Sequence, residues 1–287
     1  MALTTLLTAV ALLSGPSLND RLVDAVRHND LGKATELLRK GAKADYTVQD
    51  RTPVLLEAFR ASTSYNAKGS MEPMVKLLLN SGANAKAIDG FGWNALTLAP
   101  ETVSLDLMKA LIAKGAEPNR VAMHGDPAIV RFAGKRFDIV KLLIENGAKV
   151  DLEGYFGHTA LGVAAQAGRK DIVQYLQSKG ANPNYHAWNQ LTPMYWAASC
   201  TGDNSAILTY LEGFGAKVNP DKGAAPLHAA ATWGSAANAK WLIEHGASLN
   251  VKDGNGRTPL ESARYLEKEL KQDRSDVIQV LKKASGG

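Results

Sequence analysis

The sequence predicts an all-α solenoid of about eight helix–turn–helix units stacked side by side. Three observations predict it: a Gly-Ala dipeptide recurs, an apolar helical pattern precedes each copy, and a Thr-Pro-Leu-like start follows most copies. The copies that follow such a helical pattern begin at residues 41, 82, 115, 147, 180, 215 and 246, so the spacings are 41, 33, 32, 33, 35 and 31 residues. Self-similarity with a period of about 33 residues indicates a repeat architecture.

Each part of the repeat has a physical reason. Segments such as "IVKLLIENGA" and "IVQYLQSKGA" place apolar residues at helical spacing and end in glycine, which adopts the left-handed conformation that ends many helices. Threonine in "LTPMYWAA" and "RTPLESA" caps the next helix, and proline suits its first turn. Alanine pairs let neighbouring helices approach closely. A unit of this size buries its apolar faces only against its neighbours.

This pattern strongly resembles the ankyrin repeat family, over nearly everything from Leu18 to about Lys283. The most faithful matches are "GRTPLESA" at 256–263 and "GAAPLHAAATWG" at 223–234. The resemblance implies an ankyrin-repeat solenoid with β-hairpin fingers between the units. It also implies that His228, in the "PLH" position, forms a hydrogen bond between adjacent turns.

We expect the repeat domain to cover 18–287, with a capping repeat at about 18–49, repeats at about 50–252 and a C-terminal capping repeat at about 253–287. Ser17 and Asp20 have the spacing of a capping box at the start of the first helix. Pro100 should shorten the first helix of the third unit. The insertion around Ser62–Ser70, "STSYNAKGS", is either a tolerated loop or a functional one.

The first 17 residues stand apart from the repeats. Residues 3–13 form an apolar run of 11 residues, too short to span a bilayer as a helix but suited to a secretory signal. No lysine or arginine precedes the run, and the alternative is a hydrophobic helix packed on the first unit. We favour a cleaved signal at 1–17, which predicts a secreted or periplasmic protein; without cleavage the protein is cytoplasmic. No membrane span is predicted.

The composition and the absence of known catalytic motifs argue against an enzymatic function. The net charge of +5 comes from scattered lysines and arginines, and the single cysteine, Cys200, allows neither an internal disulfide nor a zinc motif. The motifs HExxH, GxSxG and GxxxxGK[ST] are absent from the sequence. We therefore predict a protein that is not an enzyme and has no catalytic residues, metal or cofactor. A metal shared by His158 and His186 is the weaker alternative.

The candidate site follows from the resemblance. In ankyrin proteins the fingers stand beside the first helices, and together they line a concave face on which family members usually bind partners. Carrying those positions over gives two aromatic fingers, "GFGW" and "GYFGH", a third finger, "AWNQL", and the ends of two first helices. The predicted partner-binding residues are Phe59, Phe91, Trp93, Tyr155, Phe156, His158, Trp188, Leu191 and Trp233.

The resulting functional prediction is a monomeric, non-catalytic scaffold that captures a protein partner. Exposed aromatic side chains favour this because they dominate binding hot spots. One alternative is that the rings stack on adjacent fingers and only stiffen the array. Others are a single-stranded nucleic-acid binder, ranked lower because the fingers carry few basic residues, and an enzyme with an unrecognised polar site.

Overall fold

The computed structural model describes residues 16–48, 51–62 and 69–286. These residues form eight consecutive helix pairs in two compact units, Met1–Met123 and His124–Gly287. The first unit contains α2 (Leu18–Arg27), α3 (Leu31–Arg39), α4 (Val54–Ser62), α5 (Glu72–Asn80), α6 (Ala95–Leu98) and α7 (Leu105–Ala113). The second contains α8 (Ala128–Phe132), α9 (Phe137–Glu145), α10 (Ala160–Gln166), α11 (Lys170–Ser178), α12 (Pro193–Ala198), α13 (Ser205–Gly213), α14 (Pro226–Trp233), α15 (Ala236–Glu244), α16 (Pro259–Leu270) and α17 (Ser275–Ala284).

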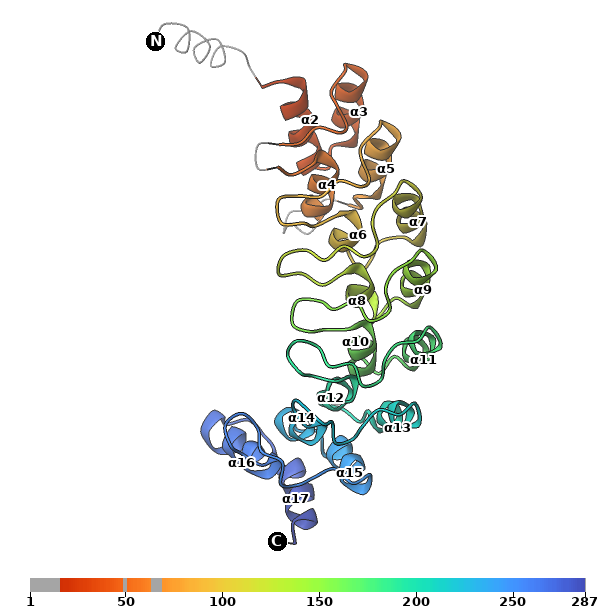
Figure 1. Cartoon of the computed structure of the whole chain (residues 1–287). Helices are drawn as coiled ribbons and strands as arrows, with labels where there is room; N and C mark the ends of the chain where they lie inside the picture. Colours follow the sequence, from red (N-terminus) through yellow and green to blue (C-terminus); the bar gives the residue numbers. More distant parts are fainter. Residues whose placement is uncertain (1–15, 49–50, 63–68, 287) are drawn as a thin grey trace, which may run out of the picture. The chain divides into compact units, whose positions relative to one another are not determined.

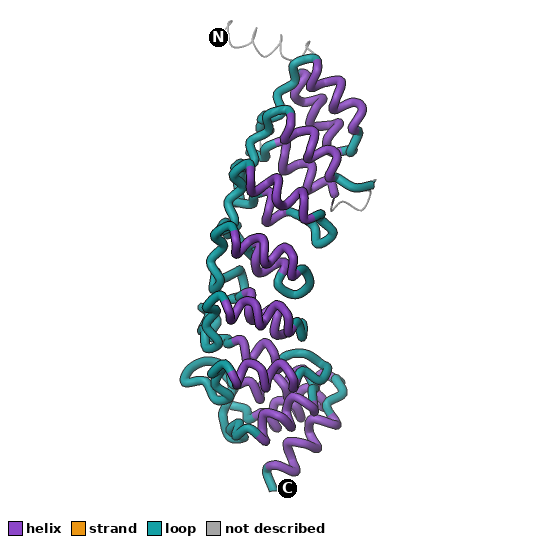
Figure 2. The backbone as a smooth tube through the Cα atoms, turned by 90° about the vertical axis from the view of Figure 1, so that its right-hand side faces the viewer, coloured by secondary structure: helices purple, strands orange, loops and turns teal. Residues whose placement is uncertain are grey.

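Within each unit the helices pack in two rows (Figure 1). In the first unit α2, α4 and α6 follow one another in one row, and α3 packs on α5 in the other. In the second unit α8, α10, α12, α14 and α16 form the first row, and α9 packs on α11 while α13, α15 and α17 follow one another. Figure 2 shows the loops between the pairs stacked along these rows. The predicted all-α repeat architecture is therefore confirmed.

Two sequence predictions fall on residues outside the described ranges. The signal predicted at 1–17 lies mostly there, and so does most of the insertion around Ser62–Ser70. Both stay predictions. Among the described residues, no helix is long and apolar enough to cross a membrane.

Helix ends follow the predicted chemistry. The glycines of the seven Gly-Ala dipeptides that follow a second helix have φ between +82° and +96°, in the left-handed region that glycine adopts freely. Ser17 and Asp20 form the expected capping box, with the Asp20 amide donating to Ser17 Oγ at 3.2 Å. Helix α6 ends at Leu98, two residues before Pro100, so the proline shortens it as expected.

The fingers are hydrogen-bonded turns. Among the described residues the one β-bridge, Thr47 with Pro53, is isolated, and the fingers are closed by a few backbone hydrogen bonds each. The amide of Asp89 donates to Trp93 O at 3.0 Å, and the amide of Gly154 donates to His158 O at 2.8 Å. Each finger thus reverses the chain in very few residues and presents its tip beside the first helix that follows.

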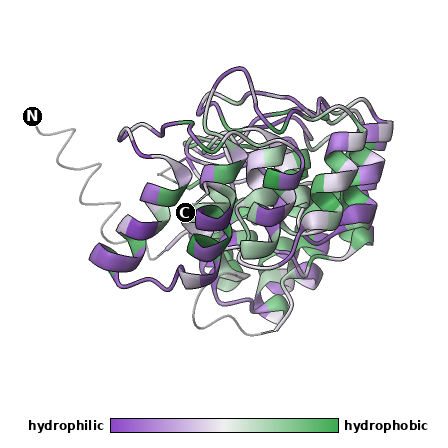
Figure 3. Cartoon of the chain, turned by 90° about the horizontal axis from the view of Figure 1, so that it is seen from below, coloured by the Kyte–Doolittle hydropathy of each residue, from purple (hydrophilic) through white to green (hydrophobic). Residues whose placement is uncertain are grey.

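Small apolar residues let the first helices pack closely. Ala164 and Ala165 of α10, Ala197 and Ala198 of α12, and Ala229–Ala231 of α14 are all fully buried. The second helices contribute the larger aliphatic side chains, such as Leu176 and Leu208. Figure 3 shows hydrophobic and hydrophilic residues on opposite sides of individual helices. The core is therefore a continuous apolar layer between neighbouring pairs within each unit.

A buried amide network links three successive pairs in the second unit. Asn204, 6% exposed, donates from Nδ2 to Ala165 O and Ala197 O, both at 2.8 Å. Its own amide donates to Asn238 Oδ1 at 2.8 Å, and Asn238 is fully buried. These bonds supply a donor to the Ala197 carbonyl at the end of α12 and a second donor to the Ala165 carbonyl of α10, which also accepts from the Gly168 amide at 3.1 Å.

The glycine requirement can be tested at neighbouring positions. Gly215 has φ +87° and open space around a built Cβ, so Gly215→Ala should cost about 1 kcal/mol through backbone strain alone. Gly213, the last residue of α13, also has open space but lacks a positive φ, so Gly213→Ala should be neutral or stabilising by up to about 1 kcal/mol. Urea unfolding followed by circular dichroism measures both. Equal losses of unfolding free energy in the two variants would contradict the conclusion that Gly215 is required for its left-handed backbone.

Removing the centre of the buried amide network should destabilise the protein more than the glycine substitutions do. Asn204→Ala removes two buried hydrogen bonds, to Ala165 O and Ala197 O, and should lower the free energy of unfolding by about 1–3 kcal/mol. Asn219 donates to a carbonyl in the same way, to Gly246 O at 2.8 Å, but it is exposed. Asn219→Ala, measured in the same urea titration, should therefore cost less than Asn204→Ala.

Candidate binding surface on the fingers

In the first unit, the finger before α6 is organised by one buried carboxylate. Asp89, 5% exposed, accepts the amides of Phe91 and Trp93 at its Oδ1, both at 2.9 Å. Its other oxygen accepts from Arg60 Nη2 of α4 at 2.6 Å. With the tip fixed in this way, Phe91 is 60% exposed, while Trp93 is half-buried. Phe91 therefore lies where the sequence predicted, and Trp93 is partly used in packing.

The prediction for Phe59 was wrong. Phe59 is fully buried in α4. It lies six residues after Pro53, whereas Trp233, with which it was matched, lies seven residues after Pro226. One residue turns a helical side chain by about 100°, enough to move it from the outer face to the core. The position that matches Trp233 is occupied by Arg60, which pairs with Asp89.

In the second unit, the predicted aromatic residues reach the surface of two adjacent fingers. Phe156 is 57% exposed and Tyr155 is 39% exposed on the finger before α10, and Trp188 is 66% exposed on the finger before α12. Leu191 and His158 are half-buried. Trp233 is 47% exposed at the end of α14, where Gly234 ends the helix in the left-handed conformation.

Several of these rings touch one another. The Tyr155 ring lies 4.9 Å from the His124 ring and 4.3 Å from the Phe156 ring, measured between centroids. The His158 ring lies 6.1 Å from Phe156 and 4.9 Å from Trp196. The structure therefore brings Tyr155, Phe156 and His158 into one cluster and adds His124 and Trp196, two residues that the sequence reasoning missed.

A glycine makes room for Trp196. A Cβ built on Gly162 of α10 would lie 2.8 Å from Trp196 Cδ1, closer than real Cβ contacts. Gly162 is the third residue after the N-cap, the position that His228 occupies in α14. The Trp196 indole N–H is buried and lacks a hydrogen-bond acceptor among the described residues, which is unfavourable for folding. The signal in the sequence was a glycine where the repeat pattern has a larger side chain.

Polar side chains tie the fingers of the second unit together. Asp126 accepts the Tyr155 amide at 3.0 Å and lies 3.4 Å from His158 Nδ1. Glu153 accepts the Trp188 amide at 2.8 Å and the Tyr185 hydroxyl at 3.1 Å. The Asn189 amide group returns a hydrogen bond to Phe156 O. Each exposed ring is therefore next to a backbone group that the neighbouring finger holds in place.

The remaining candidates are structural. His228 Nε2 lies 2.9 Å from Arg257 O of the next finger, which confirms the bond between turns that the family resemblance implied. The described residues contain no group of three or more His, Cys, Asp or Glu side chains that could hold a metal ion. Cys200 is half-buried, with Sγ 3.3 Å from the Asn238 amide nitrogen, and so belongs to the surroundings of the amide network.

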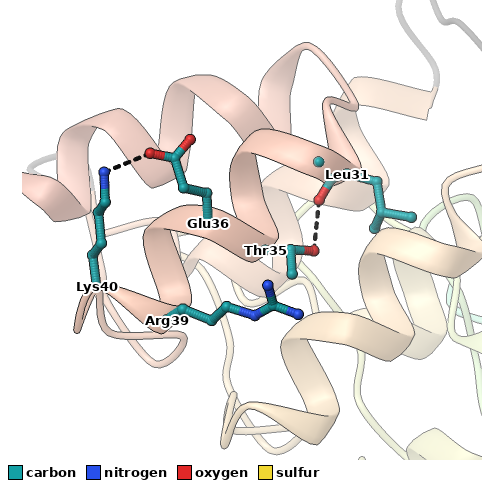
Figure 4. Close-up of a pocket in the computed structure, with 6 residues that line it drawn as sticks. Leu31, Thr35, Glu36, Arg39 and Lys40 are labelled. Carbon is teal, nitrogen blue, oxygen red and sulfur yellow. Dashed lines mark hydrogen bonds and ion pairs between the residues drawn. The ribbon is translucent and has the colours of Figure 1, made fainter.

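A surface hollow beside α3 is a weaker candidate in the first unit (Figure 4). Leu31, Gly32, Thr35, Glu36, Arg39 and Lys40 line it. Glu36 accepts from Lys40 Nζ at 2.6 Å and from Lys33 Nζ at 2.9 Å, and these two ammonium groups lower the pKa of its carboxyl to about 2. One carboxylate is thus shared by two ammonium groups, and Arg39 adds a further positive charge. The hollow therefore has a net positive charge and no aromatic side chain in its lining.

The comparisons with known proteins fit this architecture. The sequence model described as "Ankyrin repeats (3 copies)" matches residues 128–220 and 194–284, more than half of the chain. The chain therefore belongs to the ankyrin-repeat family. The crystal structure of the human ASB11 ankyrin repeat domain superposes with a TM-score of 0.54 at 21% identity and covers 93% of this chain and 98% of that one. That similarity supports the fold.

Two of the sequence relatives are longer proteins. Human transient receptor potential cation channel subfamily A member 1 is 28% identical over 197 residues, which are 64% of this chain and 17% of that protein. The mouse B-cell lymphoma 3 protein homolog is 29% identical over 175 residues, which are 59% of this chain and 39% of that protein. The chain thus spans less than half of either relative, and the similarity lies in the repeats.

The corrected position of Phe59 predicts a contrast within the first unit. Phe59→Ala removes a fully buried ring and should lower the free energy of unfolding by about 3–5 kcal/mol. Phe91→Ala removes a ring that is 60% exposed and should change it by less than about 0.5 kcal/mol. Chemical denaturation of the two variants measures the difference. A similar loss in both would mean that the Phe91 ring is structural.

Proposed function

We propose that the chain is a non-catalytic scaffold that binds a protein partner on the fingers before α10 and α12. Ankyrin repeats as a class mediate protein–protein interactions, and the family membership of this chain supports that role. The observation that carries the proposal is the combination of large exposed rings with a rigid support. Phe156 and Trp188 are more than half exposed, yet the backbone of each finger is held by hydrogen bonds from its neighbour.

Rigidity matters because binding costs entropy. An exposed aromatic patch is unusual on a protein surface unless a partner covers it. Aromatic side chains have few rotatable bonds, and a fixed backbone removes a further cost of ordering the loop on binding. The finger-to-finger contacts predicted as the alternative are present. The Tyr155 ring packs on the His124 ring of the preceding finger, and the other contacts use backbone groups and polar side chains. They leave the outer faces of Phe156 and Trp188 available.

The two rival functions have less support. A single-stranded nucleic-acid site needs basic groups along the phosphate path, and the segments 151–159 and 182–192 contain neither lysine nor arginine. A catalytic site needs a polar group with a perturbed environment in a pocket. The polar groups of the fingers are instead engaged in closing turns and joining neighbours.

The test is alanine substitution of the exposed rings, with an exposed aromatic from elsewhere as the control. Trp188→Ala and Phe156→Ala should each weaken partner affinity by more than about 1 kcal/mol and leave the thermal unfolding midpoint nearly unchanged. Phe214, 49% exposed next to α13, is the matched control, and Phe214→Ala should bind like the parent. Affinity capture with quantitative mass spectrometry identifies the partner, and calorimetry with the purified partner then gives the affinities.

Two results would reject the proposal. One is an affinity that Phe214→Ala lowers as much as the finger variants do, because the fingers would then have no special role. The other is a collapse of thermal stability in Trp188→Ala and Phe156→Ala, because the rings would then be structural.

A further inference from the structure

The charges around the aromatic fingers differ in sign from the chain as a whole. The net charge is +5, but the segments 151–159 and 182–192 carry two carboxylates, Asp151 and Glu153, and no lysine or arginine. Asp126, which bonds to the Tyr155 amide, adds a third carboxylate at the same place. A locally acidic surface on a basic protein attracts positively charged groups.

Three cations near these segments, Arg169, Lys170 and Lys179, lie at the two ends of α11 and have their own partners. Lys149, two residues before Asp151, also has a partner of its own. Arg169 pairs with Asp171 at 2.7 Å beside α11. Lys170 lies 5.3 Å from the Tyr210 ring, and Lys179 lies 5.3 Å from the Tyr175 ring. None of these three belongs to the two acidic segments, so the carboxylates near the exposed rings are not neutralised by them.

The carboxylates are fixed close to the rings. Glu153 uses one oxygen for the Trp188 amide and the other for the Tyr185 hydroxyl. A carboxylate has about four acceptor positions, so these bonds leave acceptor capacity and do not remove the negative charge. The negative charge of Glu153 is thus held by a hydrogen bond to the backbone amide of Trp188, a residue that is 66% exposed.

Aromatic faces and carboxylates together favour one class of side chain. A guanidinium stacks on aromatic faces, is always charged, and is more weakly hydrated than an ammonium group. The second unit shows the same contact internally, with the Arg257 guanidinium carbon 3.8 Å from the centre of the Tyr265 ring.

We propose that the partner binds through an extended, arginine-containing segment, with an arginine over the ring of Phe156 or Trp188 and its charge facing Glu153 and Asp126. This inference rests on the proposed function and adds which kind of side chain the partner presents to the fingers. Acidic or phosphorylated segments, and nucleic acids, would meet carboxylates here and be repelled.

The experiment is selection of a random twelve-residue phage-displayed peptide library on the full chain, with counter-selection on the double variant Phe156→Ala, Trp188→Ala. The peptides that survive depend on the rings. The proposal expects them to be enriched in arginine. Replacing that arginine by citrulline, which has a similar shape and no charge, should weaken binding in fluorescence anisotropy by more than about fivefold.

Charge on the protein is tested separately. Glu153→Gln with Asp126→Asn keeps a carbonyl acceptor for each backbone amide but removes both charges, and should also weaken the arginine peptide by about fivefold. The citrulline peptide should bind the parent and this variant equally. Glu244→Gln, which alters a carboxylate on α15 that lies 3.9 Å from Lys240, is the control and should bind like the parent. Thermal unfolding confirms that each variant is folded.

The outcomes separate this inference from the proposed function. Ring-dependent peptides without basic residues, or equal affinity of arginine and citrulline peptides, would overturn the inference and leave the binding scaffold standing. A selection that yields no ring-dependent peptide would count against both.

Discussion

The structure depends on the burial of each helix pair against its neighbours. A pair such as α10 with α11 has apolar residues on more faces than it can bury alone, and Ala164 and Ala165 become fully buried only because α8 and α12 pack on either side. Burial of this kind needs short side chains on the first helices. Every backbone group at the helix ends must then find a partner nearby, and this requirement explains the buried amides of Asn204 and Asn238.

The same stacking accounts for the fingers. Because successive pairs are in register, a side chain of one finger meets the backbone of the next at hydrogen-bonding distance, as Asp126 does with the Tyr155 amide and Glu153 with the Trp188 amide. The fingers therefore need no long strand pairing to be ordered. Their stability comes from closing bonds such as Gly154 to His158 and from these cross-finger carboxylates.

Local rules predicted most of the fold from the sequence. Thr159, Thr192 and Thr258 cap α10, α12 and α16, because capping chemistry depends on residues within a few positions. Features that depend on register or on distant neighbours were missed. The error at Phe59 came from one position of helical register, and the position of Trp196 depends on Gly162, 34 residues away. The exposure of Phe91, Phe156 and Trp188 was predicted from their places in the fingers, and their role in binding stays a prediction.

Within a finger, backbone and polar groups form the stabilising hydrogen bonds, and the exposed rings do not take part in them. The bonds that hold the finger before α12 involve the Trp188 amide and the Asn189 side chain, so the Trp188 indole contributes nothing to them. A smaller residue at 188 would keep the same amide and the same finger. Trp188, 66% exposed, adds apolar surface in water without strengthening those bonds, so they do not explain its presence. The proposed partner would cover the ring, and the Glu153 carboxylate that accepts the Trp188 amide would favour a positively charged group there.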